Sequence, residues 1–158
     1  MSVMIEKYER WFMYGTAIML ALFFGAIVLS VTESNAHLQT DNGIVDSNAL
    51  RDTPPFDEPG VVQTGPNSYT AVVISQAWQF TPSEIRVPAG AEVTFVVASQ
   101  DVIHGFMIPQ TRVNGMVIPG RITELTQTFD EPGEHTIICH EFCGIGHNRM
   151  YGKVVVEG

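Results

Sequence analysis

The longest apolar stretch of the chain lies near its N-terminus. Residues 11–31 form a run of 21 positions without a charged side chain, long enough to cross a hydrocarbon layer of about 30 Å as a helix. The basic residues Lys7 and Arg10 precede this run, and no further Lys or Arg follows it until Arg51. By the positive-inside rule, this asymmetry predicts a single-pass anchor with a cytoplasmic N-terminus and an extracytoplasmic remainder.

A cleaved signal peptide is the alternative interpretation of the same run. Residues 34–36 (Ser-Asn-Ala) offer the small side chains that a signal peptidase accepts. The apolar regions of signal peptides, however, have only about 7 to 15 residues. Trp11 and Tyr14 near one end of the run also favour a membrane helix that is retained. We therefore interpret residues 1–36 as a transmembrane anchor with its flanks.

The next segment, residues 37–68, follows no sustained hydrophobic period. It contains four prolines and three glycines, residues that interrupt regular structure. This composition predicts a linker. A folded domain is then expected over residues 69–158.

From residue 69 onward, short runs of β-branched and aromatic residues alternate with Pro and Gly. No stretch keeps a 3.6-residue apolar period for three turns, so strands are predicted rather than helices. Turns are expected at residues 88–90, 119–120 and 132–133, where Pro is followed at once or shortly by Gly. The fold class is therefore mainly β, a sandwich or barrel. The predicted strands cover residues 69–75, 84–87, 92–98, 113–118, 122–129, 135–138 and 153–156.

The charge balance narrows the range of partners. The chain has 17 Asp and Glu against 8 Lys and Arg, a formal net charge of −9. Nucleic-acid binding depends on clustered basic residues that neutralise phosphates. A nucleic-acid partner is therefore excluded.

The residues best suited to chemistry lie in a loop over residues 139–150. Cys139, Cys143, His147 and Met150 place two thiols, an imidazole and a thioether within twelve positions. Such soft donors select copper or zinc, and the methionine favours copper. Gly144 and the nearby Gly146 would allow the loop to fold back so that the donors converge. A Cys139–Cys143 disulfide is the alternative interpretation.

A second thiolate exceeds what a one-copper site needs and indicates a second metal ion. Two coppers bridged by two thiolates would need one more imidazole from outside the loop. His37 lies in the predicted linker, His135 precedes Cys139 by about 13 Å of extended strand, and His140 would point away from its neighbour Cys139. His104, within the apolar stretch DVIHGF, is the candidate that remains.

These residues resemble a known family. The loop CHEFCGIGHNRM, together with the upstream His of DVIHGF, is similar to the CuA signature of subunit II of haem-copper cytochrome c oxidases. The segment FTPSEIRVPAGAEVTFVVAS also resembles the part of that family that leads to the first ligand. With one helix in place of a helical hairpin, the chain looks most like the single-helix ba-type (B-family) branch. The resemblance implies a cupredoxin-like Greek-key β-sandwich or barrel on one N-terminal transmembrane helix.

The resemblance also implies a binuclear copper centre, CuA, with two copper ions per chain. In the family, two thiolates bridge both coppers, each imidazole binds one copper, and the two weak donors are a methionine sulfur and a backbone carbonyl. Carried over to this chain, the ligands are His104, Cys139, the carbonyl of Glu141, Cys143, His147 and Met150.

Four further residues carry weaker expectations from the resemblance and from their positions. Asp101, three residues before His104, is a candidate hydrogen-bond partner of that imidazole. The side chain of Glu141 is a candidate ligand of a Mg²⁺ ion shared with subunit I. Trp78 and Phe80 resemble the aromatic cluster through which electrons reach CuA, and ordinary core packing is their alternative.

The resemblance predicts the electron-input subunit of a terminal oxidase in a bacterial or archaeal cell membrane. Its CuA domain would face the periplasmic or extracytoplasmic side. There it would take electrons from cytochrome c or another carrier such as a copper protein, and pass them to the haem-bearing subunit I for O₂ reduction. The acidic surface is suited to steering a cationic cytochrome. The alternatives are the CuA subunit of a nitric oxide reductase, a membrane-anchored copper-delivery or thiol oxidoreductase protein, and a one-copper carrier.

Overall fold

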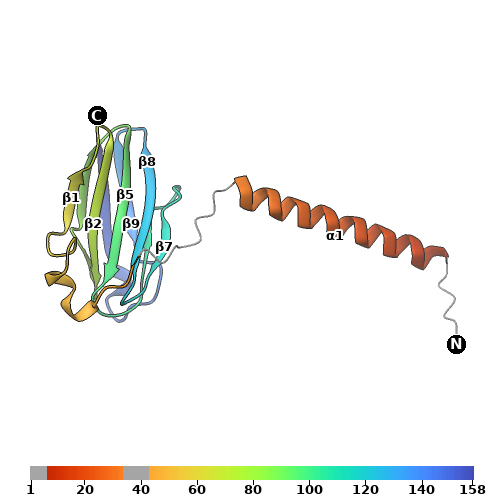
Figure 1. The fold of residues 1–158 in the computed structure, drawn as a ribbon, viewed down its shortest axis with the longest axis horizontal. Coiled ribbons are helices and arrows are strands. Elements are labelled where there is room, and N and C mark those ends of the chain that lie inside the picture. The colour runs from red at the N-terminus through yellow and green to blue at the C-terminus, as the bar shows by residue number, and fades with distance from the viewer. Residues whose placement is uncertain (1–6, 34–42) are drawn as a thin grey trace. The chain divides into compact units, whose positions relative to one another are not determined.

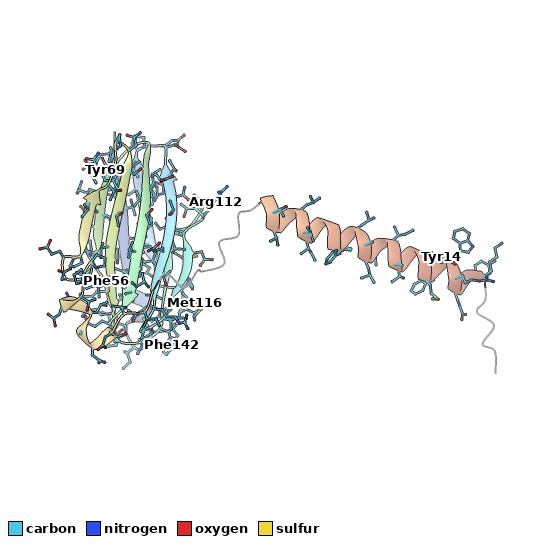
Figure 2. The ribbon with its side chains drawn as sticks, viewed as in Figure 1. Tyr14, Phe56, Tyr69, Arg112, Met116 and Phe142 are labelled. Atoms are coloured by element: carbon cyan, nitrogen blue, oxygen red, sulfur yellow. The ribbon has the colours of Figure 1, made fainter. Side chains whose placement is uncertain are left out.

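The computed structural model describes residues 7–33 and 43–158, which belong to two compact units. The first contains the helix α1, Lys7–Glu33, which includes the whole predicted apolar run. By length and composition, residues Lys7–Thr32 qualify as a membrane span. Tyr14 and the other apolar side chains project outward along the helix (Figure 2). Residues 34–36 of the signal-peptide alternative, and His37, lie outside the described residues.

The second unit is built from two five-stranded sheets (Figure 1). In one sheet β1, β2, β5 and β8 follow one another and β3 pairs with β2, and in the other the order is β4-β10-β9-β6-β7. The predicted mainly β architecture is confirmed as a sandwich. Its strands are β1 Gly60–Gln63, β2 Ser68–Gln76, β3 Gln79–Thr81, β4 Glu84–Pro88, β5 Ala91–Ser99, β6 His104–Met107, β7 Asn114–Val117, β8 Ile122–Phe129, β9 Gly133–Ile138 and β10 Tyr151–Glu157.

All seven predicted strands are present, and the sequence pattern missed β1, β3 and β6. Each of the missed strands has only three or four residues. An alternation of apolar and polar positions is hard to recognise over so few residues. They form because neighbouring strands already supply hydrogen-bonding partners, as β2 does for both β1 and β3.

The main core lies between the sheets. Phe106 contacts Phe80 and Phe95, each with ring centroids 5.4 Å apart, and Phe95 also contacts Phe129 at 6.3 Å. These four rings come from β3, β5, β6 and β8 and are all buried. Aromatic packing of this kind joins the two sheets firmly, and it places β6 with its first residue, His104, deep in the sandwich.

The prediction of a linker over residues 37–68 is corrected by the structure for residues 43–68. Within this segment, residues 43–59, here called the strap, include the 3₁₀ helix η1, Ser47–Asp52. Leu50 and Phe56 of the strap are fully buried. They cover apolar side chains on the outer face of the first sheet, and β1 follows and pairs with β2. The cluster consists of Val45, Leu50, Phe56, Val72, Ile74 and Ala98.

Candidate metal centre

The loop over residues 139–150 connects the antiparallel strands β9 and β10. The register pairs Ile138 with Tyr151, and the N–H of Cys139 donates to the carbonyl of Met150 at 3.3 Å. The first and last predicted donors of the loop therefore meet at its base. Gly144 has a φ of +117°, a conformation that favours glycine. The predicted reversal of the loop is confirmed, and the short helix η2, His147–Arg149, completes it.

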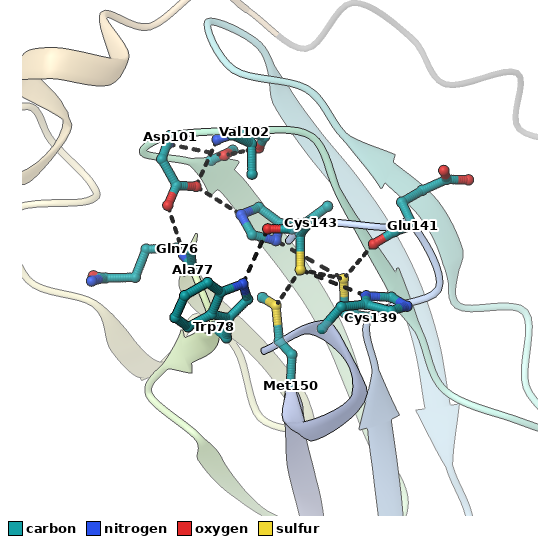
Figure 3. A network of polar contacts seen from close by, with 12 residues as sticks. Gln76, Ala77, Trp78, Asp101, Val102, Cys139, Glu141, Cys143 and Met150 are labelled. Atoms are coloured by element: carbon teal, nitrogen blue, oxygen red, sulfur yellow. Dashed lines mark hydrogen bonds and ion pairs between the residues drawn. The ribbon is translucent and has the colours of Figure 1, made fainter. Parts of the chain in front are cut away.

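The sulfur and nitrogen atoms of this loop converge around Cys143 (Figure 3). Its Sγ lies 3.8 Å from Cys139 Sγ, 3.6 Å from His147 Nδ1 and 3.6 Å from Met150 Sδ. Both cysteines are buried and free, and their sulfurs are much further apart than the about 2.05 Å of a disulfide bond. In this structure the two thiols face a common point instead of bonding to each other.

Two further donor atoms, from His104 and Glu141, complete the set of candidate ligands. His104, fully buried at the start of β6, directs Nδ1 to within 3.9 Å of Cys139 Sγ. The carbonyl oxygen of Glu141 lies 3.2 Å from the same sulfur. His104, Cys139 and Cys143 form a group whose ligand atoms all lie within 4.8 Å of one another. The structure thus brings together all six ligand candidates named from the sequence.

Asp101 fixes the orientation of the His104 ring. Its Oδ1 lies 2.7 Å from His104 Nε2, which leaves Nδ1 to face the thiols. The carboxylate also accepts hydrogen bonds from the backbone N–H groups of Ala77 and Val102, each at 2.7 Å (Figure 3). Partial burial acts to raise the pKa of Asp101, but these three hydrogen bonds outweigh it and lower the pKa below its ordinary value. Such a partner orients a metal-binding imidazole.

The protonation of the thiols shows what metal binding requires. Burial and, after it, the adjacent Cys139 side chain together raise the pKa of the Cys143 thiol to about 11. The Cys143 thiol of the metal-free site is therefore protonated at neutral pH. Because thiolates rather than thiols bind metals, loading the site must release protons.

Two glycines permit the close packing around the loop. A Cβ at Gly146 would collide with the Trp78 ring, and one at Gly105 would lie 2.6 Å from the His140 ring. The Gly105 N–H also points at Cys139 Sγ at 3.5 Å. Gly105 was not among the residues predicted from the sequence, although a glycine directly after a ligand histidine was an available signal.

Of the histidines that were set aside, His135 and His140 lie in the described part of the chain, and each packs against another residue. The ring of His135 packs at a tilt against Phe129, with ring centroids 5.0 Å apart. His140 packs against Gly105, and its Nδ1 lies 3.6 Å from the Glu141 carboxylate. The Glu141 side chain points away from the sulfurs while its carbonyl faces them (Figure 3).

Trp78 and Phe80 occupy different environments. Trp78 is 44% exposed, and its indole N–H donates to the carbonyl of Cys143 at 3.1 Å. Phe80 is only 2% exposed and packs edge-on against Phe106. Phe80 thus has the core packing that was the alternative for these two rings, because β3 turns its side chain between the sheets.

The apolar tip of the loop was not predicted as a feature. Phe142 is 80% exposed and Ile145 is 92% exposed. Figure 2 shows Phe142 at the end of the sandwich opposite Tyr69. Large apolar side chains exposed beside a buried site mark a surface that another protein can cover.

The donor set fits copper. Thiolate, thioether and imidazole ligands together favour copper, whereas sites for harder metals are built from oxygen ligands. All six donors are contributed by one end of a rigid β-sandwich. The fold and the site define the class of protein, a copper-binding, cupredoxin-like domain carried by a chain with an N-terminal apolar helix. The periplasmic domain of subunit II of the Bradyrhizobium japonicum cytochrome oxidase shares this fold, with 23% identity and a TM-score of 0.52 over 55% of this chain and 82% of that domain.

Comparison with known proteins identifies the family. Residues 75–158 match the family described as cytochrome c oxidase subunit II, periplasmic domain. Subunit 2 of cytochrome c oxidase from Thermus thermophilus is 38% identical over 97% of this chain and 94% of its own length. A chain in the structure of a heme-copper terminal oxidase dimer is 31% identical, with a TM-score of 0.76 over 96% of this chain and all of that chain.

The chain belongs to the cytochrome c oxidase subunit II family, as the resemblance in its sequence indicated. It is a subunit of a haem-copper oxidase, an oxidoreductase complex. Its similarity to the Thermus subunit extends over nearly the full length of both chains and agrees with the expected ba-type branch.

Proposed function

We propose that this subunit holds a binuclear CuA centre. Cys139 and Cys143 would bridge the two coppers, His104 and His147 would each bind one, and Met150 and the Glu141 carbonyl would be the weak donors. The observation that carries the proposal is the approach of two free thiols to 3.8 Å with an imidazole nitrogen beside each. A one-copper site would need only one of these thiols as a ligand and would leave the other without a metal.

When bound, the copper pair supplies the ability to accept and release single electrons. The protein contributes a rigid and largely dry set of donors, since Cys139, Cys143, His104 and Met150 are all buried. Asp101 holds His104 in one orientation. A site whose ligands are fixed in advance needs little rearrangement when its charge changes, and its hydrogen bonds and burial set the potential.

The route for electrons into the site is proposed to pass through Trp78. Its indole is partly exposed and is hydrogen-bonded to the backbone of Cys143. The donor, cytochrome c or another extracytoplasmic carrier, would dock over the exposed side chains of Phe142 and Ile145. The net charge of −9 suits long-range steering of a cationic donor. The haem-bearing subunit I would then receive the electrons for O₂ reduction.

Helix α1 is proposed to anchor the subunit in a bacterial or archaeal cell membrane, with its N-terminus in the cytoplasm. Lys7 and Arg10 at that end support this orientation. The copper domain would then be extracytoplasmic. The Glu141 carboxylate, which points away from the thiols, is the proposed contact to a Mg²⁺ ion shared with subunit I, because Mg²⁺ prefers oxygen ligands.

The test is metal analysis and electron paramagnetic resonance on the full chain, purified in detergent and loaded with copper. We expect about two coppers per chain, and an oxidised spectrum split by two copper nuclei that share one unpaired electron. A spectrum split by one nucleus would support the one-copper carrier instead. An inert Cys139–Cys143 disulfide without metal would support the thiol oxidoreductase.

A further inference from the structure

Arg51 of the strap connects two loops at the metal-binding end of the sandwich. It is the fifth residue of η1, and its Nε donates to Gln100 Oε1 at 3.2 Å. Its Nη2 donates to Gln76 Oε1. One planar guanidinium thus bridges two side chains that are 24 residues apart in the sequence, using the fork of donors that distinguishes arginine from lysine.

Both glutamines directly precede residues that support the site. Gln76 is followed by Ala77, whose N–H donates to Asp101 Oδ2 at 2.7 Å. Gln100 is followed by Asp101 itself, whose Oδ1 holds His104 Nε2 at 2.7 Å. Figure 3 shows Gln76, Ala77 and Asp101 side by side on one flank of the donor cluster.

The backbone brings these two loops to the same end of the sheet. Strands β2 and β5 are parallel neighbours, with Ser75 paired with Ser99. The loops that follow them therefore leave the sheet together. A single backbone hydrogen bond, from Gln100 N–H to the carbonyl of Ser75 at 3.0 Å, continues the pairing beyond the strands. Any further link between the two loops must come from side chains, as in the hydrogen bond from the Ala77 N–H to the Asp101 carboxylate.

The strap gives Arg51 a fixed base. Leu50, its neighbour, is fully buried against the outer face of the first sheet. Asp46 caps η1 by accepting a hydrogen bond from the N–H of Asn48 at 2.9 Å. A side chain that starts from a short, capped element held by a buried neighbour loses less conformational freedom when it makes a bridge than one on a free loop.

We propose that Arg51 is a positioning residue of the metal centre, which locks the loop of Ala77 and Trp78 to the loop of Asp101 and thereby fixes the His104 imidazole. The proposal rests on the proposed function only in treating His104 as a copper ligand. Arg51 acts through the glutamine side chains, because the hydrogen bonds of Asp101 come from His104 and from two backbone N–H groups.

Hydrogen exchange on the metal-free full chain in detergent tests the link itself. In Arg51→Ala we expect the amides of residues 76–78 and 100–104 to exchange about three- to tenfold faster, the range for losing one or two hydrogen bonds at a locally opening segment. The amides of β9 and β10 should keep their protection. Unchanged exchange in both loops would overturn the proposal.

Three further variants separate bridging from charge and from general destabilisation. The neutral double variant Gln76→Ala/Gln100→Ala should reproduce the faster exchange, and adding Arg51→Ala to it should change little. Arg51→Lys keeps the charge but lacks the fork, so we expect no recovery of protection. Arg86→Ala, which removes an exposed arginine paired with Glu84 and Glu157 on the other sheet, is the matched control and should leave both loops unchanged. Full recovery with lysine would show that charge matters rather than the bridge.

The copper-loaded protein then shows whether the loops matter to the site. Arg51→Ala and the double glutamine variant should both shift the reduction potential and the copper hyperfine splitting, with copper content retained, whereas Arg86→Ala should do neither. Faster exchange with an unaltered spectrum and potential would overturn the positioning role. Failure of the unmodified chain to bind copper would refute the proposed function, and the exchange data would still report on the bridge.

Discussion

The metal-binding loop, residues 139–150, and the strap, residues 43–59, contribute to the same end of the domain in different ways. The loop supplies donor atoms from Cys139, Cys143, His147 and Met150, and its tip is exposed. The strap supplies no donor, but buries Leu50 and Phe56 against the sheet and extends Arg51 toward the loops beside the site. We infer that the loop determines the chemistry, whereas the strap determines how firmly the supporting residues are held.

The largest effect is expected from removing a bridging donor of the loop. We expect Cys143→Ser to abolish the copper pair, because a hydroxyl remains protonated at neutral pH and cannot replace a bridging thiolate. Copper content and the paramagnetic resonance spectrum measure the effect. Ile145→Ser, at a 92% exposed position of the same loop, is the matched control and should keep the pair. Retention of two coppers in Cys143→Ser would contradict the assigned role.

A core substitution in the strap should act on stability instead of on metal chemistry. Leu50 is fully buried, so Leu50→Ala should lower the free energy of unfolding by about 2 to 5 kcal/mol through lost burial and a cavity. Thermal unfolding of the metal-free chain measures this. Ile44→Ala, at an 86% exposed position of the strap, should change stability by less than about 0.5 kcal/mol. Equal effects of the two variants would show that the strap is not packed as described.

The two segments also differ in how well the sequence predicted them. Cys139, Cys143, His147 and Met150 lie close together along the chain, so their spacing alone indicated a shared site. His104 was reached by elimination among the histidines. In the strap, Leu50 and Phe56 are isolated apolar residues among polar ones and prolines, and no local period marks them as buried. The continuous apolar stretch at residues 71–74 was an available signal, because a strand that is apolar on both faces must be covered on both.

Contacts between distant segments explain most of what the sequence did not reveal. The Ala77 N–H that supports Asp101 and the Trp78 N–H that reaches Cys143 join residues 24 and 65 positions apart. Neither contact has a sequence motif, because one partner in each is a backbone group, the Ala77 N–H or the Cys143 carbonyl, and such groups are present at nearly every position. The burial of Phe80 likewise depends on Phe106, contributed by another strand. Such pairs become visible only once the two sheets are assembled.

A smaller effect is expected from the weak donor of the loop. Met150 is fully buried and its Sδ lies 3.6 Å from Cys143 Sγ. Met150→Leu conserves volume, so it should cost less than about 1.5 kcal/mol of stability and keep both coppers. It should shift the reduction potential, because a weak axial ligand tunes such a site. Potentiometric titration measures the shift. Met13→Leu in α1 is the control and should leave the reduction potential unchanged. Loss of all copper would show that Met150 has a stronger role.

The smallest effect is expected from a substitution outside both the loop and the strap, in the surface ion pairs of β4 and β10. On β4 and β10, Glu84 forms ion pairs with Lys153, at 3.1 Å, and with Arg86. The hydrogen bond from Lys153 lowers the pKa of Glu84 most, and slight burial opposes this effect. Because Arg86 lowers the pKa further, the pKa of Glu84 lies below its ordinary value of 4.5. A depressed pKa in the folded state contributes stability that is present above the ordinary value and is lost as the pH falls through the folded value.

Glu84→Gln should therefore flatten the acid side of the stability profile slightly and leave copper content unchanged. Unfolding temperatures measured from neutral pH down to about pH 3 should converge for the two proteins at the acid end, because the native carboxylate is then protonated and its ion pairs are lost. The difference at neutral pH should be small, since exposed ion pairs contribute little to stability and are screened by salt. Glu92→Gln removes a carboxylate from β5 that has no ion pair within residues 43–158 and should leave the acid slope as it is. If Glu84→Gln leaves the dependence of the unfolding temperature on pH unchanged, the ion pairs on β4 and β10 are too solvated to contribute to stability. Burial would then be the source of stability in the sandwich as well as in the strap.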